Sequence, residues 1–432
     1  MVKYSQVNAP SCYPTTVFVV NSSRGTPGED AGVNPLFNGR SVPVLVLIGV
    51  ILFLIIVMTI VGNIFVILAP SVNRRLRNVT GLFIVSLAVA DLLLGIVVLP
   101  FSAILEVWRC WPFGAVLCNL YVSCDVMFCT ASILNLFGIS IDRYVAITDP
   151  MAYHQRLTRG KALLIINLMW VVSLFISFLP LHLGWNTGDG SVQNYEDPTK
   201  CGLESNKMYS LIDGIMLFFL PLTVMCSLYL RILMIARKQA RTINSQTCAL
   251  QPARRVLREN GHTSSRGESS TSASTRAHSS RNHDLAARNH AVVDEHKATK
   301  MLATIMGCFV ICWVPYFSIF TFIRVFEGAV VPKTLEMVVL WLGYVNSMLN
   351  PLLYAALNSE FRRAFRKLLK WTRLSAFRAD SNVTQLELST TSTPRQGTTN
   401  MSVRNGSVVP PMYVEVHAPD IIEQGSEVER DY

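Results

Sequence analysis

Two aspartates lie within apolar stretches of this chain, where a negative charge is costly. Asp125 falls in the apolar run 115–147, and Asp213 falls in the run 211–235. Inside a bilayer, a bare carboxylate costs several kcal/mol unless a cation or a water-filled cavity meets it. We therefore predict that Asp125 binds a cationic ligand and that Asp213 is a second anchor. Alternatively, Asp125 is protonated or its side chain snorkels to the interface between helices. The alternative for Asp213 is a solvated carboxylate at the membrane rim.

A second group of polar side chains is expected to meet inside the same bundle. Amides, hydroxyls and carboxylates at such depth are costly unless they pair with one another. Their oxygens suit a small hard cation, so we predict an allosteric sodium ion and no other cofactor. A hydrogen-bonded water cluster without an ion is the alternative. The residues are Asn63, Asp91, Ser132, Asn346, Ser347 and Asn350.

The composition indicates a membrane protein. Of the 432 residues, 51% are hydrophobic and 15% are charged, and the mean hydropathy is +0.37, which is too apolar for a soluble chain of this length. The apolar runs are continuous rather than alternating, which favours helices over barrel strands. We predict an all-α membrane protein, a seven-transmembrane helix bundle. The runs span residues 42–69, 81–101, 115–147, 162–183, 211–235, 301–322 and 335–357.

Lysine and arginine gather after the odd-numbered runs. Residues 73–77 and 362–370 are examples, whereas the loops after the even-numbered runs carry scattered charges of both signs. By the positive-inside rule, this is a multi-pass plasma-membrane protein with its N-terminus outside the cell and its C-terminus in the cytoplasm. The net charge of +10 is then a topology signal rather than a sign of nucleic-acid binding.

Composition also divides the chain around its spans. Polar residues 1–41 predict a disordered extracellular segment, and residues 42–358 form the bundle. A polar insert at about 239–290 is predicted to be disordered in the cytoplasm. Residues 359–372 alternate apolar and basic side chains at helical spacing, which predicts an amphipathic helix on the membrane surface, and residues 373–432 predict a disordered cytoplasmic tail.

Covalent modification is expected on the outer side. Cys118, at the outer end of the third run, and Cys201, in the loop after the fourth, face an oxidising compartment where a disulfide can persist. Such a bridge would tie this loop across the mouth of the bundle. Cys12 and Cys110 are a second candidate pair, and Asn21 in Asn-Ser-Ser is a glycosylation acceptor.

A set of residues recurs in a fixed order along all seven runs. They are Asn63, Asp91, Cys118, Asp142-Arg143-Tyr144, Trp170, Pro221 with Tyr229, Cys312-Trp313-Val314-Pro315 and Asn350-Pro351-Leu352-Leu353-Tyr354. In this order the chain resembles the rhodopsin-like (class A) G-protein-coupled receptors. Each residue is a weak signal alone, but the joint pattern is specific and covers about residues 42–370.

Within that family, the place of Asp125 is similar to that of the aspartate in receptors for protonated amines. The chain resembles the type-2 histamine receptors most closely, through stretches such as 125–136, 182–186 and 339–344. The resemblance implies histamine as the ligand and the stimulatory G protein, which raises cyclic AMP, as the partner. A carboxylate ringed by aromatic faces can hold an ammonium through ion pairing and cation–π contact. The implied aromatic lining is Trp313, Tyr316, Phe317, Trp341 and Tyr344.

The second anchor would select the ring of the ligand. Asp213 can accept a hydrogen bond from a ring N–H of a short ligand whose amine is held at Asp125, and an imidazole suits this role because its nitrogens donate and exchange protons. Leu217, one turn below Asp213, stands where the type-2 histamine receptors have a threonine. One hydroxyl contact to the ring is therefore missing, which predicts an altered affinity for histamine.

A switch is expected at the inner face. Arg143 is predicted to pair with Glu295 and to hold the sixth span inward, and two solvated charges are the alternative. Pro315 supplies a kink about which that span could swing, opening a cleft lined by Arg143 and Tyr229 for a G-protein helix. The predicted switch residues are Asp142, Arg143, Tyr144, Tyr229, Glu295, Pro315 and Tyr354.

Further partners follow from the tail and the membrane. The Ser/Thr-rich tail is predicted to meet receptor kinases and arrestin. No cysteine follows Cys312, so the palmitoyl anchor that the resemblance implies is absent and the amphipathic helix must attach to lipid through apolar and basic residues.

An ion-coupled transporter using Asp91 and Asp125 is an alternative class, although repeated halves or broken spans are not evident. No nucleophile–base set or metal-ligand spacing indicates an enzyme.

Overall fold

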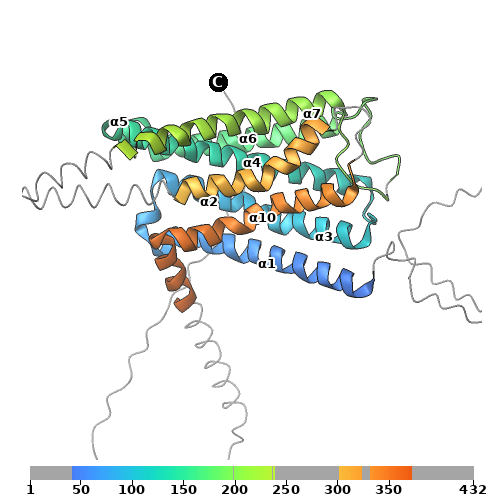
Figure 1. Ribbon diagram of the computed structural model, residues 1–432, viewed down its shortest axis with the longest axis horizontal. Coiled ribbons are helices and arrows are strands. Elements are labelled where there is room, and N and C mark those ends of the chain that lie inside the picture. The colour runs from blue at the N-terminus through green and yellow to red at the C-terminus, as the bar shows by residue number, and fades with distance from the viewer. Residues whose placement is uncertain (1–40, 198, 236, 239–300, 324–330, 372–432) are drawn as a thin grey trace, which may run out of the picture. The chain divides into compact units, whose positions relative to one another are not determined.

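Long apolar helices make up the computed structural model (Figure 1). The structure describes residues 41–197, 199–235, 237–238, 301–323 and 331–371. Within these residues, seven helices are long and apolar enough to cross a membrane, which confirms the predicted bundle. They are α1 (Val42–Val72), a span of α2 (Val79–Leu93), η3 (Leu94–Val98) and α3 (Leu99–Trp108), α4 (Gly114–Thr148), α6 (Arg159–His182), a span Lys207–Ile235 that begins with α7 (Lys207–Asp213) and η4 (Gly214–Phe219), a span Met301–Ile323 that ends with η5 (Ile319–Ile323), and α10 (Lys333–Leu357).

Three of the spans contain a wider, π-helical turn near a proline. The turn η3 comes before Pro100, η4 comes before Pro221, and η5 follows Pro315. Proline has no N–H to donate, so the carbonyl four residues earlier loses its usual partner, and π-helical turns are a common local adjustment of such helices. Because η4 begins directly after Asp213 and contains Leu217, this adjustment sets the direction in which both side chains face.

Short polar connections join the helices at the end of the bundle that carries Arg143. Asn73 accepts a hydrogen bond from the Arg75 backbone N–H in the short turn η2 (Arg74–Leu76), and Asn78 caps α2 through the Gly81 N–H at 2.7 Å. Asp149 caps α5 (Pro150–Arg156) in the same way. These side chains satisfy N–H groups that a helix start leaves unpaired.

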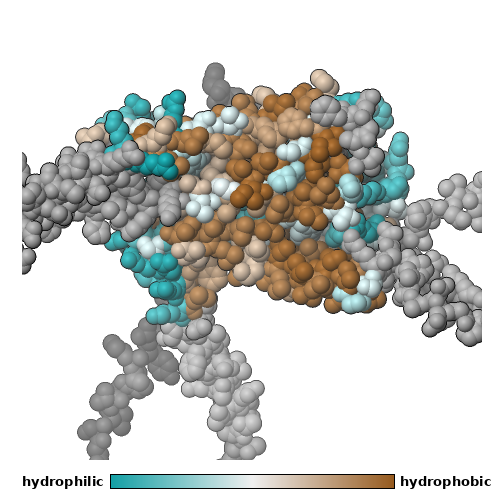
Figure 2. Space-filling model, viewed as in Figure 1, coloured by the Kyte–Doolittle hydropathy of each residue, from teal (hydrophilic) through white to brown (hydrophobic). Residues whose placement is uncertain are grey.

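On the face of the bundle shown in Figure 2, an apolar belt lies between two hydrophilic ends. Many large apolar side chains of α1 and α6 are exposed, including Phe53 at 64% and Leu164 at 69%. The longest helix, α4, instead buries much of its length among the others. Lipid would cover the belt, and α4 is thus the central element on which the site is built.

The chain turns after α10 into a further helix at residues 359–371, which confirms the predicted helix after the seventh span. Its apolar side packs on the bundle, because Phe361, Ala364 and Leu368 are buried. The Phe361 ring stacks on Tyr354 with ring centroids 5.1 Å apart, and Phe365 meets Phe65 of α1 at 5.8 Å. The exposed basic side chains lie on its other side.

Several sequence-based expectations fall on parts of the chain outside the described residues. They concern the order of residues 1–40, 239–290 and 373–432, the glycosylation acceptor Asn21, the pairing of Cys12 and the role of Glu295. These expectations stay predictions.

Candidate ligand-binding site

Asp125 lies on the inward side of α4, where two neighbours already donate to its carboxylate. The Tyr344 hydroxyl of α10 donates to Oδ2 at 2.9 Å, and the Cys129 thiol, one turn along α4, donates to Oδ1 at 3.6 Å. Tyr344 is fully buried, so this contact links the third and seventh spans at the level of the carboxylate. No basic side chain within the described residues forms an ion pair with Asp125.

One cavity is lined by both aspartates singled out from the sequence. Asp125 of α4 and Asp213 of α7 line it together with Leu217 of η4, and its volume is about 40 Å³. A cavity of that size holds only a few water molecules. A ligand with an amine and a ring therefore has to displace side chains of the wall. The sequence analysis predicted that Asp125 and Asp213 bind the same ligand, and the two side chains do line the same cavity.

Aromatic rings of the sixth span form much of the wall. Trp313, Tyr316 and Phe317 line the cavity as predicted. Phe317 stacks on Phe218 of η4 with centroids 4.0 Å apart and planes 9° apart, which couples the wall of the sixth span to the turn that carries Leu217. Trp313 meets Tyr316 and Phe317 at 5.9 and 5.7 Å.

Two predicted members of the aromatic lining lie elsewhere. Trp341 and Tyr344 are not among the residues that line the cavity. Tyr344 instead contacts the Asp125 carboxylate, and the Trp341 ring meets Tyr344 edge to face at 5.4 Å. Both residues therefore lie beside Asp125, and their contact with a ligand stays a prediction.

Sequence reasoning missed Leu203 and Gly343 as site residues. Leu203 lines the cavity from the loop after α6, only two residues beyond Cys201, so a disulfide at Cys201 was the signal that could have placed it. A methyl group on Gly343 would lie 2.8 Å from the Trp313 ring. The absence of a side chain there lets the indole pack against α10. The other lining residues that were missed are Val126, Cys129, Thr130, Ile133, Phe320 and Leu340.

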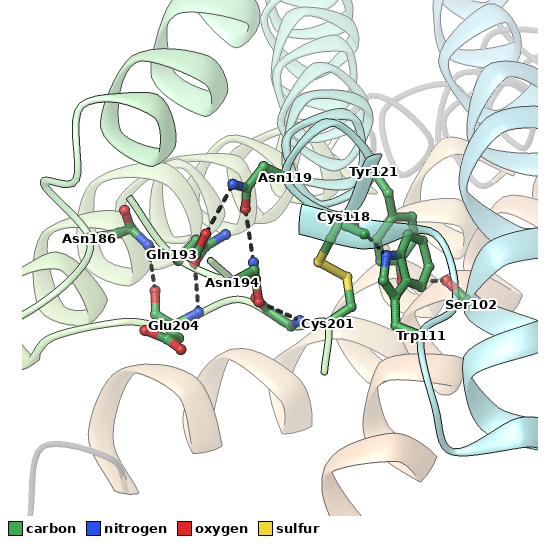
Figure 3. Close-up of a disulfide and its surroundings, with 12 residues drawn as sticks. Ser102, Trp111, Cys118, Asn119, Tyr121, Asn186, Gln193, Asn194, Cys201 and Glu204 are labelled. Atoms are coloured by element: carbon green, nitrogen blue, oxygen red, sulfur yellow. Dashed lines mark hydrogen bonds between the residues drawn. A yellow bond between two sulfur atoms is a disulfide. The ribbon is translucent and has the colours of Figure 1, made fainter. Parts of the chain in front are cut away.

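A disulfide joins Cys118 of α4 to Cys201, with the two Cα atoms 5.7 Å apart, as predicted (Figure 3). Cys110 is also disulfide-bonded, while its predicted partner Cys12 lies outside the described residues. The bridge brings the loop after α6 over the end of α4. The loop therefore covers the cavity on this side of the bundle.

Buried amides hold this loop in shape. Gln193 is 2% exposed, and its Oε1 accepts hydrogen bonds from Asn186 Nδ2 at 2.8 Å and from the Glu204 backbone N–H at 2.9 Å. Asn119, next to the disulfide on α4, donates to the Gln193 carbonyl at 3.0 Å and accepts from Asn194 at 2.8 Å (Figure 3). Buried polar groups that are paired in this way resist rearrangement, which fixes the position of Leu203.

Most of the predicted polar cluster surrounds Asp91, whose side chain is fully buried. Its carboxylate accepts hydrogen bonds from Ser347 at 2.7 Å, Asn350 at 2.8 Å and Ser132 at 3.4 Å. Asn63 donates to the Ser347 carbonyl at 3.1 Å. The Oδ1 atoms of Asn63, Asn346 and Asn350 are buried without a hydrogen-bond partner among the described residues. Carboxylate and amide oxygens of this kind fit a small cation.

At the other end of α4, Arg143 is held by its own neighbour. The guanidinium donates to the Asp142 carboxylate through Nε at 2.9 Å and through one terminal nitrogen at 2.8 Å. Thr80 of α2 and Tyr153 of α5 each donate to the same carboxylate at 2.7 Å. Burial and the bond to Asp142 raise the pKa of Tyr153 to about 12, so it stays a donor. Sequence reasoning missed Thr80 and Tyr153.

The remaining predicted switch residues lie close to the core. Tyr229 and Tyr354 are 6% and 1% exposed, and Tyr144 packs against the buried cluster at partial exposure. Pro315 lies in the sixth span, one residue before Tyr316 of the cavity wall. This span therefore runs from the ligand cavity toward the end of the bundle that carries Arg143.

Comparison with known proteins agrees with the geometry. Residues 62–354 match the family described as 7 transmembrane receptor (rhodopsin family). The chain is 45% identical to the histamine H2 receptor of Cavia porcellus over 323 residues, 75% of this chain and 79% of that receptor. It is 42% identical to the histamine H2 receptor of Homo sapiens over 353 residues, 81% of this chain and 88% of that receptor. It is also 38% identical to the alpha-1A adrenergic receptor of Oryzias latipes over 325 residues, 75% of this chain and 67% of that receptor.

The family match begins within the first span and ends within the seventh, and it includes Asp91, Asp125 and Arg143. The ordered pattern read from the sequence predicted the same family. The chain belongs to the rhodopsin family of seven-transmembrane receptors, and it is therefore a multi-pass membrane receptor rather than an enzyme.

Proposed function

We propose that this receptor binds histamine in the cavity between Asp125 and Asp213. The observation that carries the proposal is that one cavity is lined by both carboxylates together with four aromatic rings. The ammonium would pair with Asp125, and a ring N–H would donate to Asp213. The amine and the ring of histamine are only a short distance apart. This suits two carboxylates that line the same small cavity from two helices.

The names of the relatives support an amine, and the chain itself narrows the choice. Histamine H2 receptors and an alpha-1A adrenergic receptor are among its matches. The stretch from Leu211 to Leu217 contains Asp213 and no serine, so it offers a carboxylate rather than hydroxyls to a ligand ring. A carboxylate accepts hydrogen bonds and can exchange a proton with an imidazole, whereas a catechol would lack its hydroxyl partners. Leu217 in the wall predicts weaker contact with the ring than a threonine would provide.

Signalling is assigned to the opposite end of the bundle. The N-terminus and the disulfide-bonded loop would face outside, and the Arg143 end would face the cytoplasm, in line with the arginines and lysines there. Ligand binding would displace the sixth-span wall and open a cleft for the stimulatory G protein, raising cyclic AMP. Receptor kinases and arrestin would act on the Ser/Thr-rich tail.

The cluster around Asp91 would hold an allosteric sodium ion. Asp91 and the three amide oxygens that have no hydrogen-bond partner among the described residues would supply its ligands. A cation held there would favour the arrangement in which α2, α4 and α10 stay close together. A water cluster would satisfy the same oxygens, and a dependence of agonist affinity on sodium, compared with potassium at equal ionic strength, separates the two.

A panel of biogenic amines applied to cells that express the chain tests the proposal, with cyclic AMP and calcium read together. We expect histamine to raise cyclic AMP at lower concentrations than catecholamines, tryptamines or tyramine. If another amine raised cyclic AMP at lower concentrations than histamine, the protein would still be an amine receptor, but histamine would be the wrong ligand. A response in calcium alone would overturn the assignment to the stimulatory G protein.

A further inference from the structure

Two π-helical turns lie against each other where the fifth span packs on the sixth. One is η4, which begins at Gly214, and the other is η5, which contains Thr321. The Phe219 ring of η4 meets Phe322 of η5 with centroids 5.1 Å apart. Neither Gly214 nor Thr321 lines the ligand cavity, although Asp213, directly before Gly214, does. The contact between the two turns therefore lies next to the cavity wall.

The turns approach more closely than any side chain on residue 214 would allow. Gly214 is buried, and a Cβ atom built there would overlap the hydroxyl oxygen of Thr321. The same atom would lie 2.8 and 2.9 Å from the Cβ and Cγ2 atoms of Thr321, whereas an ordinary contact between carbon atoms is about 3.5–4.0 Å. Thr321 is fully buried, so its side chain is enclosed by its neighbours. Only glycine lets the backbone of η4 lie against this side chain.

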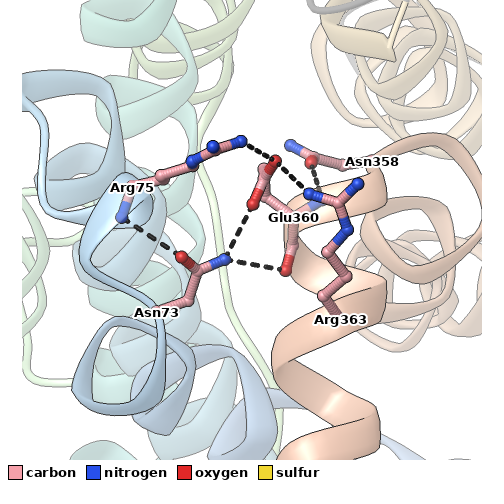
Figure 4. Close-up of polar contacts among 5 residues, drawn as sticks. All are labelled: Asn73, Arg75, Asn358, Glu360 and Arg363. Carbon is pink, nitrogen blue, oxygen red and sulfur yellow. Dashed lines mark hydrogen bonds and ion pairs between the residues drawn. The ribbon is translucent and has the colours of Figure 1, made fainter.

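Shape rather than hydrogen bonding holds this contact. Among the described residues, the Thr321 hydroxyl has no hydrogen-bond partner. The junction between the turn η2 and the helix at residues 359–371 differs, because there Glu360 accepts hydrogen bonds from Asn73 and Arg75 (Figure 4). Long polar side chains can follow a small shift between segments, whereas a backbone packed on a short side chain cannot. The sizes of residues 214 and 321 therefore set how closely η4 and η5 approach.

The form of η4 determines the direction of Asp213. Each residue of an α-helix turns by about 100° around the helix axis, and a π-helical turn contains one extra residue. Asp213 is therefore rotated by about 100° relative to Pro221, compared with a continuous α-helix. Among the described residues, no hydrogen bond or ion pair holds the Asp213 side chain. Its carboxylate thus lines the cavity through the course of the backbone alone.

The π-helical turn and the close contact depend on each other. If η4 became an α-helix, the same rotation would bring Asp213 or Ile215 to the place of Gly214. Both of these residues carry side chains, and no side chain fits at that place against Thr321. The contact therefore favours the π-helical form of η4 over the α-helical form.

We propose that Gly214 and Thr321 are positioning residues for Asp213 and decide whether the receptor distinguishes ligand rings with an N–H from rings without one. Their contact keeps η4 in its π-helical form and so keeps the carboxylate in the cavity. Neither residue touches the ligand. The inference rests on the proposed function, in which a ring N–H donates to Asp213, and it adds two residues that act through that carboxylate.

Competition binding on membranes that carry the full-length receptor compares histamine with phenethylamine, an amine whose ring has no N–H. Gly214→Ala adds a methyl group to the contact, and Gly307→Ala, on the sixth span, adds one where no atom lies within 4 Å. Thr321→Ala removes the hydroxyl oxygen and Cγ2, two of the three atoms that the new methyl group meets. Asp213→Ala, alone and with Gly214→Ala, tests whether the effect passes through the carboxylate. Radioligand saturation and melting temperature show that each variant is folded.

Gly214→Ala should lower the affinity for histamine at least about tenfold, as expected when a hydrogen bond to a charged group is broken, and that for phenethylamine less than about threefold. The double variant with Thr321→Ala should recover most of this loss, because the added methyl group then has more room. With Asp213→Ala already present, Gly214→Ala should have little further effect on histamine. Gly307→Ala should leave both affinities unchanged.

Equal losses for both ligands in Gly214→Ala, no recovery in the double variant, or a second full loss beside Asp213→Ala would overturn the positioning role. If Gly214→Ala does not fold, Thr321→Ala alone loosens the contact and should weaken histamine relative to phenethylamine; no relative loss overturns the proposal. Asp213→Ala separates this proposal from the proposed function. A loss confined to histamine in Asp213→Ala, with none in Gly214→Ala, overturns the positioning role only, whereas equal losses for both ligands in Asp213→Ala overturn both.

Discussion

The carboxylate of Asp125 accepts hydrogen bonds from the Tyr344 hydroxyl and the Cys129 thiol. An ammonium that binds there has to add a charge-assisted contact to these two or replace one of them. Because the carboxylate is surrounded by aromatic and aliphatic side chains, the ion pair would be screened little by solvent.

Asp125→Asn should abolish high-affinity amine binding, because the amide keeps the shape of the side chain and removes the counter-charge. The loss in affinity should exceed about 2 kcal/mol, more than tenfold. Radioligand saturation at matched surface expression measures it. Tyr344→Phe is the control, since it removes a neighbour of Asp125 and keeps the charge, and it should change affinity much less. Unchanged affinity in Asp125→Asn would remove Asp125 from the ligand site.

Asp213 and Leu217 are predicted to decide which ring the receptor accepts. Asp213→Ala should weaken histamine much more than amines that lack a ring N–H, because only histamine loses a hydrogen bond there. Leu217→Thr adds a hydroxyl to the cavity wall and should raise histamine potency. Competition binding and cyclic AMP assays measure the two effects. Equal losses for both ligand types in Asp213→Ala would make Asp213 a structural residue and leave the amine unspecified.

At the scale of elements, the cavity depends on how closely α10 and the sixth span approach. Trp313 is 5% exposed and packs over Gly343, while Phe317 stacks on Phe218 of η4. The same rings thus form the cavity wall and the contact between helices. Movement of a ligand against the wall would be transmitted along the sixth span, because Trp313 and Phe317 are closely packed on the side away from the cavity, against Gly343 and Phe218.

Gly343→Ala tests this packing. A Cβ atom at residue 343 would lie 2.8 to 3.0 Å from three atoms of the Trp313 ring, so the indole has to shift inside a filled wall. We expect a loss of about 1–3 kcal/mol in stability, seen as a lower melting temperature of the purified receptor. Gly307→Ala is the matched control, because no atom lies within 4 Å of its Cβ position. An equal melting temperature for both variants would show that the wall yields easily.

A hydrogen bond between α5 and α4 helps to hold Arg143 in place. Tyr153 donates to the Asp142 carboxylate, which in turn holds Arg143. Tyr153→Phe removes a hydrogen bond to a charged group, worth about 1.5 kcal/mol or more, and should raise ligand-independent cyclic AMP. Tyr195→Phe, on an exposed tyrosine of the loop after α6, is the control. Unchanged basal signalling at matched surface expression would show that Arg143 is held without Tyr153.

At the scale of the whole molecule, the disulfide between Cys118 and Cys201 joins residues 83 positions apart and brings Leu203 to the cavity. Cys118→Ala with Cys201→Ala should lower stability by about 2–5 kcal/mol, because the loop regains freedom in the unfolded chain. Ligand affinity should fall as well, since Leu203 is released from the cavity. Cys226→Ala, at a free and exposed cysteine, is the control. Thermal melting and radioligand binding measure both effects, and an unchanged affinity would exclude the loop from the site.

Much of this molecule could be read from the order of its residues. Spanning helices are specified by local composition, because a bilayer demands about 20 apolar residues and internal hydrogen bonds whatever the neighbours are. The seven spans and the cost of Asp91, Asp125 and Asp213 in apolar surroundings follow from this local rule. The helix after the seventh span follows from its own spacing of apolar and basic residues.

Tertiary structure decided which side chains meet. The sequence of α10 does not show whether Tyr344 lines the cavity or donates to Asp125, and the position of α10 in the bundle gives the hydrogen bond. Thr80 and Tyr153 join Asp142 from other helices, and Leu203 reaches the cavity through a disulfide. A helix rotation is set by packing between helices, and the residues of one helix alone do not specify it.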